Sequence, residues 1–120
     1  MMRKTVLFAL AILGTATPAL AGSSATVDRT GYTAIAAGDL SAAEQRIVAE
    51  RKIFPQRPEL MINLASVYHR TGRDSEARAL YAAVLERPAV AMDLPSGAVA
   101  SSHDLASRAL ARQTQQIATR

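Results

Sequence analysis

The sequence predicts an all-α fold of about five helices stacked as antiparallel pairs, and three observations support this prediction. Alanine is frequent and aromatic residues make up only 4% of the 120 residues, which favours close-packed helices over a sheet. The chain also matches itself when it is shifted by 34 residues, so that Gly38 falls on Gly72 and Ala43 on Ala77. That shift is the length of a two-helix repeat. Signals that start and stop helices recur along the same stretch.

The first 21 residues have the pattern of a cleavable signal peptide. Arg3 and Lys4 precede an apolar run over 6–13, and the small residues of 19–21 follow in the order that a signal peptidase requires. The apolar run is shorter than the roughly 20 residues that span a bilayer, and no second long run follows. We expect export to the periplasm of a Gram-negative bacterium, with no membrane span after cleavage and a folded domain over 22–120. A buried amphipathic helix is the alternative.

Composition narrows the possible function classes. The chain has no cysteine, so disulfides, a thiol nucleophile and soft metal ligands are excluded. Loss of Arg3 and Lys4 from the 14 basic residues would leave 12 against 10 acidic ones, a net charge of +2. The remaining arginines are spread along the chain and do not alternate with aromatic residues, so we expect a solvated surface and no nucleic-acid partner.

The first helix pair is expected over about 24–57. One helix is predicted over 25–37, weakened at Gly31 and ended by Gly38. The spacing of Ser41-Ala42-Ala43-Glu44 is that of a capping box, and it predicts a second helix that runs to about Phe54.

The second pair, over 58–88, has the clearest signals. Pro58 opens a helix, Gly72 ends it, Asp74 or Ser75 caps the next helix, and Pro88 ends the pair. Apolar residues recur every three or four positions in both helices, which predicts one buried face on each. These residues are Leu60, Met61, Leu64, Ala65, Val67 and Tyr68, followed by Ala77, Leu80, Tyr81, Val84 and Leu85.

Residues 89–100 interrupt the helical pattern. Pro95-Ser96-Gly97 has turn composition, so a small β-hairpin is one interpretation and an irregular loop is the other. A final helix over 101–118 is expected to begin at the cap formed by Ser101 to Asp104 and to fray from Gln113 onward.

The segment 58–88 resembles a tetratricopeptide repeat. That family places a large apolar residue, Leu with a small residue, Tyr, Gly, Ala, an aromatic residue and Pro in a fixed order. The matching positions here are Met61, Leu64, Ala65, Tyr68, Gly72, Ala77, Tyr81 and Pro88. The segment 24–57 is a weaker copy, with Gly38 and Ala43 in register. Leu105-Ala106-Ser107 repeats Leu64-Ala65-Ser66 after one period plus a seven-residue insertion, so the last helix is expected to cap the stack.

The resemblance implies a short right-handed solenoid that binds a protein or peptide and has no enzymatic activity and no cofactor. In this family the first helix of each pair lines a concave groove. The groove candidates in this chain are Asp28, Tyr32, Ile62, Asn63, Ser66, His69 and Arg70. An ordinary solvated face is the alternative. A further alternative is a scaffold that uses its open helical end to form a homodimer, with no ligand in the groove.

Two other patterns were weighed as functional sites. Ser102-His103-Asp104 contains the residue types of a catalytic triad, but neighbours on a helix point about 100° apart and do not face each other. His69 and His103 have no carboxylates at metal-ligand spacing. We therefore expect a helix-start cap at 102–104 and no metal site.

Overall fold

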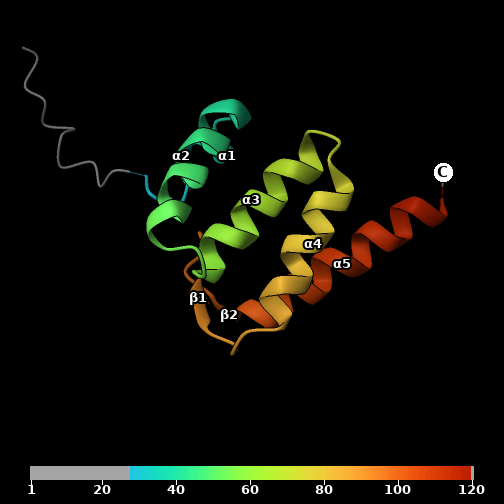
Figure 1. Ribbon diagram of the computed structural model, residues 1–120. Helices are drawn as coiled ribbons and strands as arrows, with labels where there is room; N and C mark the ends of the chain where they lie inside the picture. Colours follow the sequence, from blue (N-terminus) through green and yellow to red (C-terminus); the bar gives the residue numbers. More distant parts are fainter. Residues whose placement is uncertain (1–27, 120) are drawn as a thin grey trace, which may run out of the picture.

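The computed structural model describes residues 28–119, which form five helices and one two-stranded sheet (Figure 1). In chain order the elements are α1 (Tyr32–Ala36), α2 (Leu40–Ile53), α3 (Pro58–Arg70), α4 (Asp74–Leu85), β1 (Ala91–Asp93), β2 (Val99–Ser101) and α5 (Ser102–Ala118). The prediction of a mainly helical fold with about five helices is confirmed, and so is the small hairpin. The predicted signal peptide lies outside the described residues. None of the helices within 28–119 is long and apolar enough to cross a membrane.

Helix α3 lies in the middle of the molecule, between α1 and α2 on one side and α4 and α5 on the other (Figure 1). Leu60, Leu64 and Val67 pack with Ala43 and Ile47 in one apolar cluster. Burial of each large aliphatic side chain stabilises the fold by roughly 2 kcal/mol relative to exposure.

The opposite side of α3 belongs to a second apolar cluster. There Met61 and Ala65 pack with Ala77, Tyr81 and Val84 of α4 and with Ala106 and Ala109 of α5. The alanines bring the three helix backbones close together, because they add little volume between them. Burial raises the pKa of the Tyr81 phenol, so this ring stays neutral within its cluster.

The first helix is shorter than the sequence predicted. It begins at Tyr32 and not near residue 25, because Gly31 adopts a left-handed conformation with φ 71° that cannot continue an α-helix. The predicted residues 25–27 lie outside the described part of the chain. Gly31 is also buried, and a Cβ placed there would lie 2.6 Å from Cγ1 of Ile47. A glycine is therefore required at residue 31 for both its backbone conformation and its lack of a side chain.

Two predicted helix caps were wrong in detail. Helix α2 is capped by Asp39, whose Oδ1 accepts from the amide of Ala42 at 3.1 Å, and not by Ser41. Helix α4 begins after Arg73 with no side-chain cap, while the carboxylate of Asp74 hydrogen-bonds to Nδ1 of His69 at 2.7 Å. The predicted helix end at Gly72 is confirmed, since φ there is 81° and α3 stops at Arg70.

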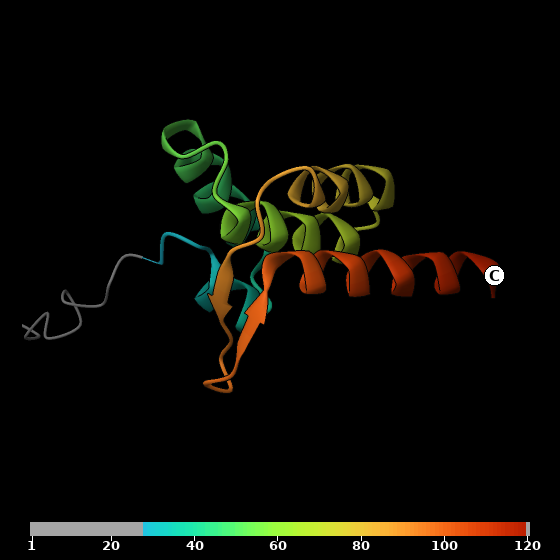
Figure 2. The ribbon, with the colours of Figure 1, turned by 90° about the horizontal axis from the view of Figure 1, so that it is seen from below.

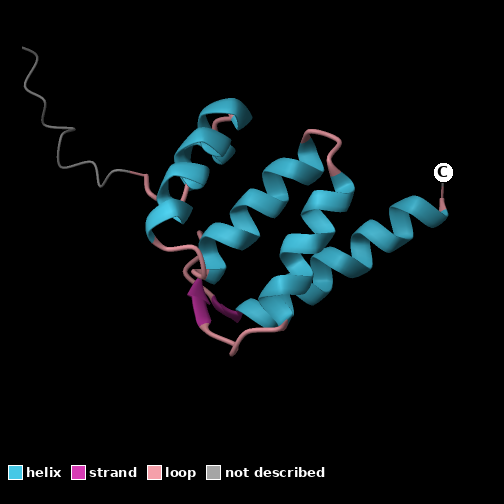
Figure 3. Cartoon of the chain, in the orientation of Figure 1, coloured by secondary structure: helices cyan, strands magenta, loops and turns pink. Residues whose placement is uncertain are grey.

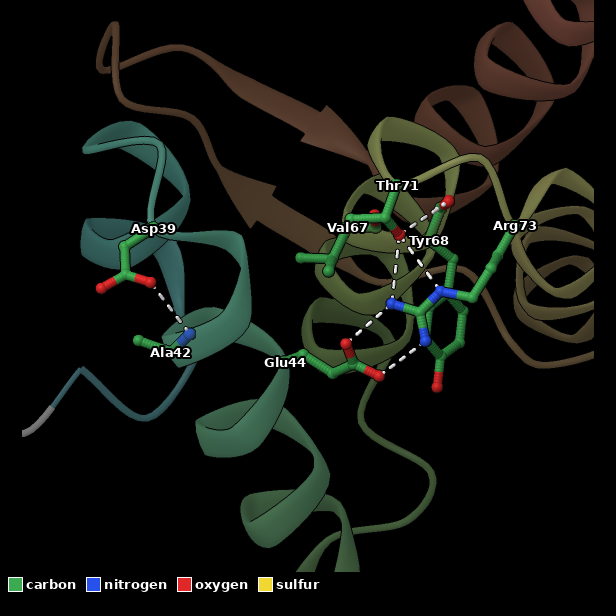
Figure 4. A network of polar contacts seen from close by, with 7 residues as sticks. All are labelled: Asp39, Ala42, Glu44, Val67, Tyr68, Thr71 and Arg73. Carbon is green, nitrogen blue, oxygen red and sulfur yellow. Dashed lines mark hydrogen bonds and ion pairs between the residues drawn. The ribbon is translucent and has the colours of Figure 1, made fainter.

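Arg73 joins the two helix pairs through a network of polar contacts (Figure 4). Its guanidinium donates to both carboxylate oxygens of Glu44 in α2, at 2.8 and 2.7 Å, and lies 4.3 Å from the ring centre of Tyr68. Thr71 accepts from Nε of Arg73 at 3.1 Å and itself donates to the carbonyl of Val67 at 2.8 Å. Glu44 therefore links α2 to the turn between α3 and α4, whereas the sequence suggested a role in a capping box.

Ser102, the first residue of α5, joins this helix to Val90, the residue before β1. Strands β1 and β2 pair antiparallel with Met92 opposite Ala100 (Figure 3). The Ser102 amide donates to the carbonyl of Val90 at 2.8 Å, and its Oγ accepts from the Val90 amide at 3.0 Å. The neighbouring His103 hydrogen-bonds through Nε2 to the carbonyl of Arg87, and Ser101 caps α5. The Ser-His-Asp sequence is thus used to start a helix.

Helix α5 continues through the region where fraying was expected. It extends to Ala118, and Gln113 is only 3% exposed. Neither polar atom of the Gln113 amide has a hydrogen-bond partner among the described residues. Burial of the face that carries Ala106, Ala109 and Gln113 accounts for the longer helix, because tertiary packing outweighs the polar composition.

Substitution of two left-handed glycines should separate backbone strain from steric overlap. Gly72→Ala should lower the free energy of unfolding by about 1 kcal/mol, the cost of a left-handed backbone with a Cβ. Gly31→Ala carries the same cost and also the overlap with Ile47, so it should lose at least about twice as much. Urea denaturation of both variants measures this, and equal losses would contradict the close approach of Gly31 to Ile47.

Removal of the Glu44 carboxylate should produce a pH-dependent loss of stability. The hydrogen bond from Arg73 holds the Glu44 pKa below its usual value of 4.5, so the pair stabilises the fold above about pH 4.5 and loses this effect as the pH falls through the lowered pKa. Glu44→Gln should cost about 1 kcal/mol at pH 7, because the pair is partly exposed, and less at pH 3. Melting curves at both pH values measure the difference. Glu86→Gln, at an exposed residue, is the control.

Candidate functional site

A pocket of about 440 Å³ opens between the first helix of each pair, the start of α5 and the hairpin. It is lined by residues of α1, α3, β1, the turn that follows β1, and α5. Figure 2 shows the hairpin projecting from the start of α5, away from the α3–α4 pair. The hairpin therefore forms one wall of the pocket, and the helices α1 and α3 form the facing wall.

Most of the pocket wall is apolar. The apolar lining residues are Tyr32, Ile62, Met92, Leu94, Pro95 and Leu105. Met92 is only 8% exposed, although it belongs to a three-residue strand whose neighbours on either side are exposed. The hairpin thus turns one side chain inward to complete the pocket.

The polar groups of the pocket are Thr30, Glu59, Asn63 and Asp93. The amide Nδ2 of Asn63 donates to the carbonyl of Thr30 at 2.8 Å, which ties α3 to the segment before α1. The Thr30 hydroxyl donates to Oδ1 of Asp28 at 3.4 Å. These bonds engage one amide hydrogen of Asn63 and the Thr30 hydroxyl. The second Asn63 amide hydrogen and the Tyr32 hydroxyl are further donors at the pocket, beside the acceptor oxygens of Asn63, Thr30 and two carboxylates.

The structure brings three of the seven groove candidates together at this pocket. Tyr32, Ile62 and Asn63 line it, and Tyr32 is 46% exposed. Ser66 lies on α3 four residues after Ile62, beyond the pocket.

The other three candidates have identifiable local contacts. Asp28 accepts from the Ala34 amide at 3.2 Å and lies 3.7 Å from Nη1 of Arg46, so its carboxylate holds the start of the first pair. His69 contacts Asp74, as described above. Nη1 of Arg70 donates to the carbonyl of Ile35 at 3.3 Å, near the end of α1, where a positive charge is favourable.

The sequence did not indicate seven of the ten residues that line the pocket. Thr30, Glu59, Leu105 and the segment Met92–Pro95 were not among the groove candidates, although they line the same space. The seven-residue insertion was a usable signal for the hairpin residues, because an insertion between stacked helices must lie on one face of the stack.

No group of three His, Asp or Glu residues that could hold a metal ion occurs in residues 28–119. The buried Ser102 is engaged with Val90, and His103 with the carbonyl of Arg87. The pocket combines a mostly apolar lining with two carboxylates.

Comparison with known proteins identifies the repeat. The family model described as tetratricopeptide repeat matches residues 34–90, which hold α2, α3 and α4 and end before β1. No curated protein and no solved structure matches the chain. Residues 34–90, a little under half of the chain, are therefore similar to tetratricopeptide repeats.

Proposed function

We propose that this protein is an exported, non-enzymatic interaction module of the bacterial envelope that binds a peptide segment of a partner protein. The family supports a protein partner, because its repeats are generally interaction modules. The observation that carries the proposal is the pocket between α1, α3 and α5, since these are the first helices of successive pairs. An extended peptide lying along this face would contact all three helices.

Export is supported by the pattern of residues 1–21 and by the domain that follows. A basic pair, an apolar run and a small-residue cleavage pattern occur there in the order of a signal peptide. The absence of cysteine does not oppose export, because the two apolar clusters around α3 supply the packing that disulfides supply in many small exported domains.

The alternative is a scaffold that associates through its last helix. The exposed residues of α5 oppose this use, because they include Asp104, Ser107, Arg108 and Arg112. Polar outer faces are typical of helices that end a repeat stack. A homodimer through this face would have to remove these charged groups from water.

Cleavage of the first 21 residues during secretion tests the proposed export. We expect the chain, expressed with its first 21 residues in a Gram-negative host, to be recovered from the periplasm with Gly22 as its first residue. Ala21→Asp should block cleavage, because the peptidase requires small residues there. N-terminal sequencing and mass measurement check both. An uncleaved cytoplasmic product of the unchanged chain would contradict the proposal.

Site-specific photocrosslinking tests the proposed binding surface. A photoreactive amino acid at Ile62, in the pocket, should crosslink a partner in cells of the source organism. The same amino acid at Ala79, an exposed residue of α4 outside the pocket, is the matched control. We expect at least a several-fold excess of crosslinked product at Ile62. Equal yields at the two sites, or product at Ala79 alone, would contradict binding along the α1–α3–α5 face.

A further inference from the structure

We propose that the pocket recognises a basic peptide segment, in which one Lys or Arg lies next to an apolar residue. This inference rests on the proposed peptide-binding function and names the chemistry of the partner. Three properties of the pocket carry it: hydrogen bonds hold the hairpin at its base and turn, the lining is mostly apolar, and its charged groups are two carboxylates.

The hairpin wall is held in place at its base. Ser102, which is fully buried, exchanges two hydrogen bonds with Val90 at 2.8 and 3.0 Å. The turn is closed by the Leu94 amide, which donates to the carbonyl of Ala98 at 2.8 Å, and by the Gly97 amide, which donates to the carbonyl of Leu94 at 2.9 Å. The hairpin side of the pocket is therefore held by hydrogen bonds at its base and at its turn.

The size and lining of the pocket fit a short segment with an apolar residue. Its volume of about 440 Å³ lies in the lower part of the range of roughly 300–1,000 Å³ that is usual for ligand pockets. Ile62, Met92 and Leu105 provide aliphatic surface, and the half-exposed ring of Tyr32 borders it. The methylene stem of a Lys or Arg side chain can also pack on such a surface while its charged end reaches polar groups.

The charge of the pocket selects a cation. Glu59 and Asp93 contribute two carboxylates, and among the described residues that line the pocket there is no Lys or Arg. Nε of Arg57 lies 3.8 Å from Oε2 of Glu59, but its side chain is 44% exposed, and such a surface pair is weak and screened by salt. An acidic peptide would meet like charges, whereas a Lys or Arg would bring a positive charge and charged donors to the two carboxylates.

The segment of this chain that directly precedes residue 28 has no basic side chain that could occupy the pocket. Residues 22–27, Gly-Ser-Ser-Ala-Thr-Val, contain no basic residue. A segment of a partner protein is therefore the occupant that the charge of the pocket fits.

The test uses four blocked hexapeptides and the purified protein. The first has Leu-Arg at its centre between Gly and Ser residues. In the others, citrulline replaces Arg, Glu replaces Arg, or Gly replaces Leu. Citrulline keeps the shape of Arg and removes its charge. Binding is measured by amide chemical shifts in ¹H–¹⁵N spectra, with Ile62 and Leu105 as reporters of the pocket.

We expect the Leu-Arg peptide to bind about tenfold more tightly than the citrulline peptide, because the two peptides differ only in the positive charge of the central side chain. The Glu peptide should not bind, and the Gly-Arg peptide should bind more weakly than the Leu-Arg peptide. Glu59→Gln and Asp93→Asn should each weaken binding of the Leu-Arg peptide several-fold and leave binding of the citrulline peptide unchanged. Glu86→Gln removes an exposed carboxylate outside the pocket and is the matched control.

Equal binding of the Arg and citrulline peptides, no binding of either at millimolar concentration, or full binding to both pocket variants would overturn the inference. Thermal melting curves of the variants establish that they remain folded. If these peptides fail while Ile62 still crosslinks a partner, the basic specificity is wrong and the proposed function stands. If both experiments fail, the α1–α3–α5 face is not the binding surface.

Discussion

The structure depends on the double burial of helix α3. This helix of 13 residues contributes Leu60, Leu64 and Val67 to one apolar cluster and Met61 and Ala65 to the other. Two of its faces are therefore committed to packing, and the remaining face carries Ile62, Asn63 and Ser66. The pocket lies beside this face, with α1, the start of α5 and the hairpin around it. Two pocket residues also contribute to packing, because Ile62 contacts the second cluster and Met92 is buried, so substitutions at the pocket would affect the core as well.

The hairpin changes what a short repeat stack can recognise. Helix pairs alone present a shallow, open face, and binding to such a face depends on many contacts spread along several repeats. Here the insertion after Pro88 supplies the segment Met92–Pro95 to the lining of a half-open pocket beside α1, α3 and α5. Under the proposed function, one half-open subsite would supply contacts that longer stacks spread over several repeats.

Local sequence signals predicted the helices but not the contacts between distant segments. Pro58 at the start of α3 and Gly72 after it were identified correctly, because each acts on its own backbone. The caps were less certain because Asp39 and Ser41 are both good capping residues two positions apart. The burial of Gln113 and the pairing of Glu44 with Arg73 depend on the packing of other helices. For the same reason, only the α1 and α3 side of the pocket could be predicted.

The separation in sequence between the two pocket walls has a kinetic consequence. Most contacts join neighbouring elements of the chain, such as α3 with α4 and α4 with α5, and contacts of this kind form early. The pocket instead joins Thr30 and Tyr32 to the segment Met92–Pro95, about sixty residues later. Closing so long a loop costs entropy that the apolar clusters must first offset. We therefore expect the pocket to be completed late in folding, after the helices that carry it have packed.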